Sequence, residues 1–443
     1  MHWYEMKLSG RGQTNSGVSQ VCRPERTADI AKYLEQVGKN GVIARGSAGS
    51  YADQALNAGG AVMQMNRLDC IRSFDAQTGE LVCEPGVTLK TITELYAPQG
   101  FMLATASASG QHTLGGAIAA NIIGCNGHKR MSLAKSVNWI DVVLADGTTV
   151  RASEKENDTL FKAVVGGQGL LGIISLISIT LLKRPQENVT VEKKRIANLD
   201  ELAETLKAVR KTADFCSFWI DTSAGLEAVG RGILKTASFT KENPPASSFS
   251  FPKFKMILPG IVLYLASFSL IKRLRFRLTA TKKQKIEAYE SFLYSSDNVQ
   301  VFPAKGIYQL QISFSEAEGP QALRRILTEL AQTRIGACRA ELVLTKEDTL
   351  SYLGAALRGY TVCFDFFRRK GIEEFLKHLI VVAGEHNGRV SVQDDALLEP
   401  RNLVLMYKNL EKFLKARDLY NPQKKFDSDF GRRLFSGEKK YEQ

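Results

Sequence analysis

The segment Ile43–Asp53, IARGSAGSYAD, decides how this chain is interpreted. It follows a short apolar run at 41–44 that predicts a buried strand. Small residues in a tight turn bring successive backbone N–H groups together and form a concave site for an anion such as a pyrophosphate. The segment is not a P-loop, because no Gly-Lys-Ser/Thr follows. By itself it is equally typical of an ordinary strand-to-loop turn.

Two further glycine-bearing segments follow. One is TLGGAIAAN at 113–121, continued by GCNG at 124–127, and the other is VGGQGLLGII at 165–174. A run of small residues lets the backbone pass close to a flat ligand. Each segment alone is compatible with simple close packing. The order and spacing of all three are much more specific, and they favour a nucleotide-type cofactor.

The flanking sequence predicts a mixture of helices and strands. Thr27 is a candidate cap for a helix over 27–38, and a second helix ends at Gly100. Two β-rich runs on either side of Asp146-Gly147 predict a hairpin over 137–150. Further strands are predicted over 61–68, 80–87 and 172–183. Pro185 then marks a domain boundary.

The middle of the chain alternates strand and helix patterns. Strands are expected near Trp219, over 301–315 and over 359–367, and helices over 200–212, 319–333 and 371–385. This order predicts an α+β domain with an antiparallel sheet. The tail from 402 to 434 is predicted to be helical, with a break at 421–422.

Composition limits the function classes. A length of 443 residues suits two or three domains. Seven cysteines without a CxxC motif favour a reducing compartment, and the N-terminus has no signal-peptide pattern, so a cytoplasmic location is expected. Five histidines without a ligand pair argue against a metal site. The net charge of +13 leaves nucleic acid, an anionic membrane and a phosphorylated substrate as partners.

The location of the charge decides among these partners. An apolar run at 256–271 is followed by a dense basic cluster up to 285. The run is shorter than the roughly 20 residues that a membrane-spanning helix needs. The segment 251–285 is therefore predicted to lie on the inner, anionic surface of a membrane, and the alternative is a buried helix with a solvated basic end. No stacking aromatic residues alternate with the basic ones, so nucleic-acid binding is not expected.

Taken together, the three segments resemble the FAD domain of the vanillyl-alcohol-oxidase class and are similar to the decaprenylphosphoryl-ribose oxidases within it. The resemblance extends over nearly the whole chain, from LSGRG at 8–12 to FDSDFGRRL at 426–434. It implies an α+β fold with a two-lobed PCMH-type FAD-binding domain at 1–185, completed by 389–443. An antiparallel-sheet substrate domain at 186–388, carrying the membrane-facing insert near 251–285, is implied between them.

The resemblance also implies the cofactor site. The FAD pyrophosphate would be held by Ala44, Arg45, Gly46, Ser47, Ala48, Gly49, Ser50, Tyr51 and Asp53. The flavin would be lined by Thr113, Leu114, Gly115, Gly116, Ile123, Gly124, Cys125, Asn126, Gly172 and Ile173. Tyr51 stands where many relatives carry the histidine that bonds covalently to the flavin. FAD without a covalent link is therefore implied.

The implied substrate pocket comprises Trp219, Tyr294, Gln309, Gln311, Cys363 and Gln393. Gln309 and Gln311 are two apart on a predicted strand, so both side chains face the same side. Paired amides suit the hydroxyl groups of a sugar, and the alternative is a pair of polar strand residues facing solvent. The implied reaction is oxidation of a secondary alcohol of a sugar or lipid-linked phosphosugar, with a short-chain reductase as partner.

Several positions depart from the family pattern. The departing residues are Val343 and Gln393 in place of lysines, Ile123 in place of a histidine, Cys125 in place of a lysine, and Ala48 and Gly49 in place of a glycine and an arginine. One alternative is an aldonolactone-type oxidase, but its C-terminal His-Trp-x-Lys signature is missing and His2-Trp3 lies at the opposite end. A second alternative, which the missing lysines favour, is a catalytically weakened flavin-binding scaffold at the membrane.

Overall fold

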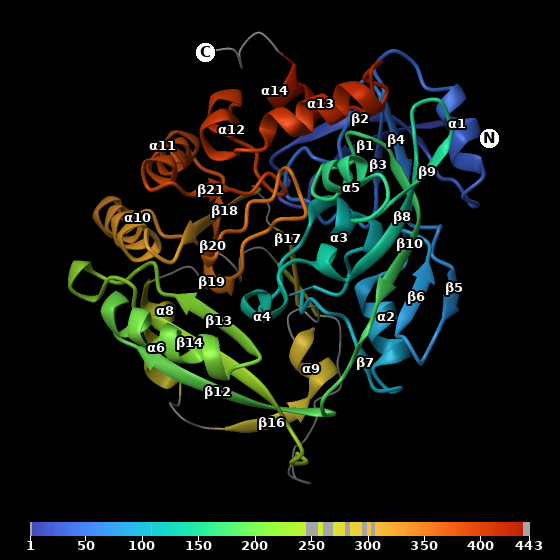
Figure 1. Cartoon of the computed structure of the whole chain (residues 1–443). Helices are drawn as coiled ribbons and strands as arrows, with labels where there is room; N and C mark the ends of the chain where they lie inside the picture. The colour runs from blue at the N-terminus through green and yellow to red at the C-terminus, as the bar shows by residue number, and fades with distance from the viewer. Residues whose placement is uncertain are drawn as a thin grey trace.

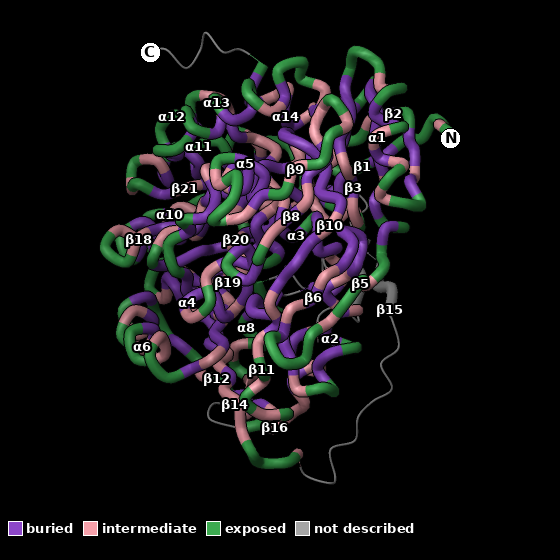
Figure 2. Tube along the Cα trace, turned by 45° about the vertical axis from the view of Figure 1, so that its right-hand side comes forward, coloured by how far each residue is buried: buried purple, intermediate pink, exposed green. Residues whose placement is uncertain are grey.

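The computed structural model describes residues 2–107, 109–244, 256–259, 269–279, 284–294, 299–302 and 306–436. Its fold is α+β, as predicted, and its main sheets have four, five and eight strands. Figure 1 shows the two smaller sheets side by side in blue and green, with the eight-stranded sheet beside them. Buried residues follow the central strands, and exposed residues lie on the outer helices, loops and edge strands (Figure 2).

The described elements are named in chain order. The strands are β1 (Tyr4–Ser9), β2 (Ser16–Cys22), β3 (Val42–Arg45), β4 (Ala61–Gln64), β5 (Ile71–Phe74), β6 (Glu80–Cys83), β7 (Phe101–Met102), β8 (Val137–Val143), β9 (Thr149–Ala152), β10 (Ile173–Thr180), β11 (Leu182–Lys183), β12 (Asn188–Ile196), β13 (Phe215–Ile220), β14 (Gly232–Thr240), β15 (Met256–Pro259), β16 (Lys285–Ala288), β17 (Val299–Phe302), β18 (Ile307–Ser315), β19 (Arg339–Thr345), β20 (Gly359–Phe367) and β21 (Arg389–Val390). The helices are α1 (Asp29–Glu35), α2 (Leu89–Tyr96), α3 (Leu114–Ala120), α4 (Gly127–Arg130), α5 (Asp158–Val164), α6 (Leu199–Thr212), α8 (Ser269–Leu278), α9 (Tyr289–Leu293), α10 (Gly319–Thr333), α11 (Ile372–Glu385), α12 (Pro400–Met406), α13 (Leu410–Tyr420) and α14 (Asp429–Phe435), with short 3-10 turns η1 (Leu133–Ser136) and η2 (Leu226–Ala228).

The four-stranded sheet has the order β1-β2-β4-β3, with a β1–β2 hairpin and parallel β2–β4 and β3–β4 pairs. Helix α1 follows β2 but begins at Asp29, not at the predicted Thr27 cap. The N–H groups of Asp29 and Ile30 bond to the carbonyls of Arg26 and Thr27 instead. A tight backbone turn therefore satisfies the donors that a side-chain cap would otherwise take.

The five-stranded sheet is antiparallel, with the order β5-β6-β10-β8-β9. The predicted hairpin is confirmed, since β8 and β9 pair across a turn in which Gly147 has φ +85°. Strand β10 lies in the middle of this sheet and is mostly buried. It continues directly from the third glycine-bearing segment, in which a Cβ on Gly169 would lie 3.0 Å from the Ile43 side chain on β3.

The C-terminal tail returns to the N-terminal sheet. The N–H of Val42 donates to the carbonyl of Lys425 at 2.8 Å, and the N–H of Asp427 donates back to Val42 at 3.1 Å. Arg433 on α14 forms a bidentate pair with Asp53 at 2.8 and 2.9 Å. The red helices therefore pack beside the blue strands in Figure 1, although the sequence separates them by nearly the whole chain.

The eight-stranded sheet has the order β16-β12-β14-β13-β19-β20-β18-β21 and is antiparallel throughout. Helices α6, α10 and α11 contact its outer face. The strand predicted over 301–315 is divided into β17 and β18, with 303–305 outside the described residues. Strand β21 extends this sheet just past the predicted boundary at 388.

Only parts of the insert 251–285 are described, namely β15, α8 with Thr279, and two residues from 284. Most of the predicted apolar run lies outside the described residues. Within the described ranges, no helix has both the length and the apolar character required to cross a bilayer.

Candidate functional site

A cavity of about 470 Å³ lies between the three glycine-bearing segments and the inner face of the eight-stranded sheet. This size is within the roughly 300–1,000 Å³ usual for ligand pockets. We call the part lined by residues from 44 to 55, 107 to 125 and 164 to 174 the loop wall. The sheet wall comprises the lining residues Ile307, Gln309, Gln311, Arg339, Glu341, Val343, Thr361, Cys363 and Asp365, together with Gln393 and Asp394.

The first loop is built to receive an anion. Within the described structure, the backbone N–H groups of residues 46–50 donate to no protein acceptor. Ala48 has φ +59°, a left-handed conformation in which successive N–H groups converge. Uncommitted donors beside a cavity match the pyrophosphate of FAD, because phosphate oxygens accept several hydrogen bonds at once.

Close backbone approaches shape the rest of the loop wall. A Cβ on Gly46 would lie 2.2 Å from Thr113 Oγ1, and one on Gly124 would lie 2.3 Å from the carbonyl oxygen of Ala106. Asn126 holds this second contact in place, since its amide accepts from the N–H of Ala106 at 2.9 Å and donates to Ala104 at 2.7 Å. The loop wall is therefore shaped to fit a flat cofactor by glycines and a clamped backbone.

Most of the predicted cofactor residues line this cavity. They are Ala44, Gly46, Ser47, Ala48, Gly49, Ser50, Tyr51, Thr113, Gly115, Gly116, Ile123, Gly124, Cys125 and Gly172. Burial raises the pKa of the Cys125 thiol to about 12, so this thiol stays protonated at neutral pH.

Two predicted pyrophosphate ligands serve the fold instead. The guanidinium of Arg45 donates to the carbonyls of Ser9 at 2.7 Å and Ala55 at 3.0 Å. Asp53 is buried and engaged by Arg433 on the C-terminal helix. Neither lines the cavity, because strand β3 and the following turn direct both side chains into the protein.

Three of the predicted flavin residues do not line the cavity either. Leu114 and Ile173 are buried in the hydrophobic core, and Asn126 is the clamp described above. Ile174 lines the cavity in place of its neighbour. Successive side chains of a strand point to opposite faces and β10 begins at Ile173, so Ile174 faces the cavity while Ile173 faces the core.

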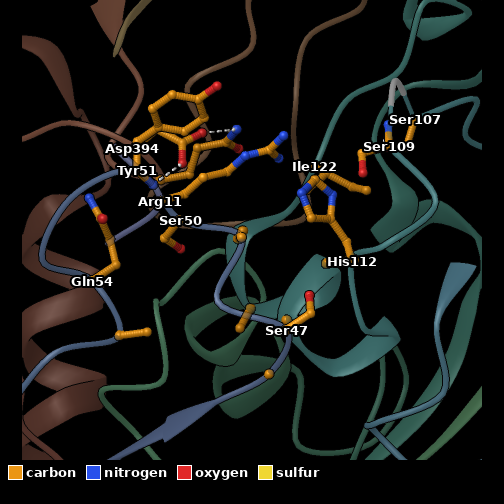
Figure 3. A pocket seen from close by; sticks show the side chains of 18 of the residues that line it. Arg11, Ser47, Ser50, Tyr51, Gln54, Ser107, Ser109, His112, Ile122 and Asp394 are labelled. Carbon is orange, nitrogen blue, oxygen red and sulfur yellow. Dashed lines mark hydrogen bonds between the residues drawn. The ribbon is translucent and has the colours of Figure 1, made fainter. Parts of the chain in front are cut away.

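Sequence reasoning missed two residues on the loop wall. Arg11 lies in the β1–β2 turn, whose N–H groups at 11 and 12 donate to Ser50 and Tyr51 at 2.8 and 2.9 Å. Figure 3 shows its side chain reaching into the pocket between Tyr51 and His112. The His112 ring packs so close to Gly49 that a Cβ there would lie 2.6 Å from it. Arg11 lies in the LSGRG segment and His112 just before the second glycine-bearing segment, but no local sequence pattern indicates that either side chain faces the cavity.

The sheet wall is organised by strand register. Gln309, Asp365 and Arg339 form one row across β18, β20 and β19, and Gln311, Cys363 and Glu341 form the next. All six side chains line the cavity. Gln309 donates to Asp365 at 2.8 Å, and Arg339 pairs with Glu341 at 2.9 Å. The predicted glutamines and cysteine thus lie among charged residues that the sequence analysis did not identify.

Two carboxylates of this wall, Asp394 and Asp365, have raised pKa values. Burial raises the pKa of Asp394 to about 6 and also raises the pKa of Asp365, on which Arg339 acts in the opposite direction. The pKa of the Tyr51 phenol is raised, first by the charge of Asp365 and then by burial. Burial, with Asp365 beside it, raises the pKa of the Cys363 thiol well above its usual range.

Asp394 connects the two walls. Its carboxylate accepts from the N–H of Tyr51 at 3.0 Å and from the amide of Gln393 at 3.0 Å (Figure 3). Gln393 also donates to the Oε1 atom of Gln311 at 3.3 Å. One carboxylate of the sheet wall therefore bonds directly to the first loop and, through Gln393, is linked to Gln311 on β18.

Two predicted pocket residues lie elsewhere. The hydroxyl of Tyr294 bonds to Thr93 Oγ1 at 2.9 Å and to the carbonyl of Leu89 at 3.3 Å, because a phenol buried against α2 needs polar partners. Trp219 lines a second, neighbouring cavity, where its ring stacks with Arg275 at 4.2 Å. No cluster of metal-binding type occurs within the described ranges.

Comparisons with known proteins agree with this geometry. A family model described as an FAD binding domain matches residues 18–153, which include the first two glycine-bearing segments. Decaprenylphosphoryl-beta-D-ribose oxidase of Mycolicibacterium smegmatis is 26% identical over 97% of this chain and 97% of its own length.

Other relatives share a shorter part of the chain. A probable mitochondrial D-2-hydroxyglutarate dehydrogenase of Oryza sativa subsp. indica is 31% identical over 39% of this chain and 33% of its own. Cytokinin dehydrogenase 2 of Arabidopsis thaliana is 29% identical over 38% of this chain and 34% of its own length. Among these three relatives, the similarity covers more than half of this chain only in the ribose oxidase.

Proposed function

We propose, from the premise that this chain is an FAD-dependent oxidoreductase homologous to decaprenylphosphoryl-ribose oxidase, that it oxidises a secondary alcohol of a lipid-linked phosphosugar to a ketone. The observation that carries the proposal is the sheet wall, where amides and carboxylates from three adjacent strands line one cavity with the cofactor loops. Amide and carboxylate groups suit the hydroxyls of a sugar better than an apolar substrate.

FAD would lie along the loop wall without a covalent link. The N–H groups of residues 46–50 would hold its pyrophosphate, and the small residues near Gly124 would face its ring system. When bound, FAD supplies the hydride acceptor. Tyr51 occupies the position at which covalent relatives carry a histidine, and its phenol is not an equivalent nucleophile. FAD released completely by acid precipitation is the expected result.

Asp394 is proposed as the group that accepts the hydroxyl proton of the substrate. It lines the cavity, and a pKa of about 6 leaves it ionised at neutral pH yet more basic than an ordinary aspartate. The N–H of Tyr51 and the Gln393 amide orient its two oxygens. Asp365 also faces the cavity, but its Oδ1 atom accepts the Gln309 amide, which suits a positioning role.

The amides are proposed to recognise the sugar. Gln311 accepts from Gln393 and lies beside Cys363, so its own NH₂ group can donate to a substrate oxygen. The family lysines are replaced by Val343 and Gln393, which leaves the carboxylates, the glutamines, Arg339 and Thr361 as the polar contacts on this wall. A short-chain reductase that converts the ketone to the epimeric alcohol is the proposed partner.

The test is anaerobic reduction of the purified holoprotein. A short polyprenylphosphoryl-β-D-ribose should bleach the flavin absorption within the turnover time, and free ribose should do so much more slowly. D-2-hydroxyglutarate serves as the competing substrate. Bleaching by the hydroxy acid alone, or by none of the three, would contradict the proposed substrate class.

Contact with an anionic membrane surface is proposed through α8. This helix exposes Leu270, Leu274 and Leu278, at 75%, 52% and 74%, in one stripe with i, i+4 spacing. Arg273 and Arg277 lie exposed beside the stripe. Apolar residues flanked by cations suit the headgroup region of an anionic bilayer.

Sedimentation with phosphatidylglycerol vesicles tests this contact. Changing the three leucines to serine should reduce the bound fraction severalfold, and 0.5 M salt should reduce it further. A matched control changes Leu405 and Leu419, which are also exposed but lie on α12 and α13. Equal loss of binding in the control would remove α8 from the explanation.

A further inference from the structure

A second cavity of about 500 Å³ adjoins the first along the eight-stranded sheet. Its described lining holds five basic side chains, Lys193, Lys235, Lys272, Arg275 and Arg339, and a single carboxylate, Glu341. Arg339 and Glu341 also line the first cavity, so the two cavities meet at this pair. The second cavity is therefore a cationic extension of the candidate site.

Strand register brings like charges together on the floor of this cavity. Lys193 on β12 is directly opposite Lys235 on β14. Like charges in such cross-strand pairs repel each other. The ammonium of Lys235 lies 4.4 Å from the centre of the Phe292 ring, a contact that compensates only part of the charge. An anion in the space above this pair would relieve the repulsion.

Helix α8 forms the roof, and two of its cations, Lys272 and Arg275, line the cavity. Lys272 is 3% exposed, and its ammonium donates to Thr222 Oγ1 at 3.0 Å and to the carbonyl of Ala337 at 2.5 Å, both neutral acceptors. Arg275, one turn later, stacks on Trp219. The leucine stripe of this helix is exposed instead. A surface helix normally buries its apolar residues and exposes its charged ones, whereas α8 buries Lys272 and exposes its leucines.

Most of the positive charge of the cavity has no described carboxylate in contact with it. In the described part of the chain, Lys193, Lys235, Lys272 and Arg275 have no carboxylate within 4 Å, and only Arg339 has one, in its pair with Glu341. Glu287 and Asp221 act on Lys235 and Lys272 from farther away. These two acids are themselves paired, with Lys285 at 2.8 Å and Arg231 at 2.5 Å.

Burial without a paired carboxylate has an electrostatic consequence. It lowers the pKa of both Lys235 and Lys272, because desolvation disfavours the ammonium form. A bound anion would reverse this effect and stabilise the charged lysines. A bound anion would therefore supply the negative charge that these buried lysines lack.

We infer that the second cavity binds a phosphate ester, the anionic arm of the substrate whose sugar reacts in the first cavity. This inference depends on the proposed function only for the statement that the sugar reacts in the first cavity, and the anion site itself does not depend on it. Phosphate oxygens accept from ammonium and guanidinium groups, and four unpaired cations match a phosphomonoester or phosphodiester. Glu341, at the junction, would repel the phosphate and accept a sugar hydroxyl, which orients the substrate.

Titration calorimetry on the full-length FAD-loaded protein tests the site, with ribose 1-phosphate, inorganic phosphate and free ribose as probes. The wild type should bind ribose 1-phosphate at least tenfold more tightly than free ribose. R275Q and K235Q should each weaken ribose 1-phosphate roughly tenfold, the loss expected for one charge-assisted contact. K211Q is the matched control, because Lys211 is an exposed cation on α6 that lines neither cavity.

The outcomes separate the alternatives. Unchanged ribose 1-phosphate affinity in R275Q and K235Q, with flavin spectra intact, overturns the inference. So does a loss of phosphatidylglycerol-vesicle binding in these variants while their sugar-phosphate affinity is retained, since the cations then serve a lipid headgroup. If the expected affinities hold but no sugar phosphate ever bleaches the flavin, the phosphate site stands and the proposed oxidation fails.

Discussion

The two walls of the main cavity differ in whether backbone or side-chain groups face the cavity. The loop wall is mostly backbone: uncommitted N–H groups at 46–50 and close approaches at Gly46 and Gly124. The sheet wall is made of side chains, with charged and amide groups in rows across three strands. From this difference we infer that cofactor binding depends on close backbone approaches that small residues allow. Substrate choice depends instead on side chains that the register of adjacent strands places in one row.

A large effect is expected from adding a methyl group to the loop wall. G124A would force a Cβ against the carbonyl oxygen of Ala106, and the Asn126 clamp prevents that segment from moving away. FAD affinity should fall by roughly a hundredfold, as expected for overpacking of a tight site. Flavin absorbance per protein measures it. The control is G38A, where a Cβ meets nothing within 4 Å, and wild-type flavin content in G124A would refute the backbone view.

On the sheet wall, D394N should slow substrate-dependent flavin reduction by roughly a hundredfold or more, the usual contribution of a general base. The wild-type rate should fall as the pH drops below about 6, where Asp394 becomes protonated. Stopped-flow absorbance at several pH values measures both. D200N, at an exposed position on α6, is the control. A full rate with an unchanged pH profile in D394N would exclude Asp394 as the base.

Asp394 should also make the stability of the protein depend on pH, with the opposite sign to the pH dependence of the rate. Its pKa is raised by burial from the ordinary 3.8 to about 6, so the folded protein binds this proton more tightly than the unfolded chain does. Asp394 therefore makes the free energy of unfolding decrease as pH rises from about 4 to about 6. D394N should remove this part of the slope in urea unfolding of the apoprotein. An identical slope in D394N and wild type would contradict the raised pKa.

A smaller effect is expected for one amide of the sheet wall. Q311L should slow flavin reduction roughly tenfold to a hundredfold, since losing one polar contact costs about 1–3 kcal/mol. The flavin spectrum should not change, because Gln311 belongs to the wall opposite the cofactor loops. Q332L, on the exposed side of α10, controls for the added leucine. A changed spectrum with a normal rate would assign Gln311 to the cofactor instead.

The smallest effect should be favourable. Ala48 adopts φ +59°, which disfavours any residue with a Cβ, so A48G should stabilise the protein by about 0.5–1 kcal/mol despite the greater freedom of glycine in the unfolded chain. Thermal unfolding of the apoprotein measures it. A208G, in the exposed middle of α6, should instead destabilise by about 1 kcal/mol. Destabilisation by A48G would mean that its side chain, not its backbone, matters.

Much of the loop wall could be predicted from the sequence because its causes are local. Glycine and small residues indicate tight turns wherever they occur, so the segments around Gly46, Gly115 and Gly124 were found, and the expected FAD and α+β fold are confirmed. The errors there were also local. Ile173 was taken for its neighbour Ile174, and Arg45 was expected at the cofactor although its guanidinium is engaged by two carbonyls.

The sequence by itself determined the cofactor class and the polar character of Gln309 and Gln311. Only the tertiary structure decided that Arg339 and Asp365 join Gln309 in one row, that Asp394 bonds to the first loop, and that α8 turns Lys272 inward. The reason is physical. A turn is set by its own residues, whereas pairing between strands dozens of residues apart, and the burial that shifts a pKa, exist only once the sheet has formed.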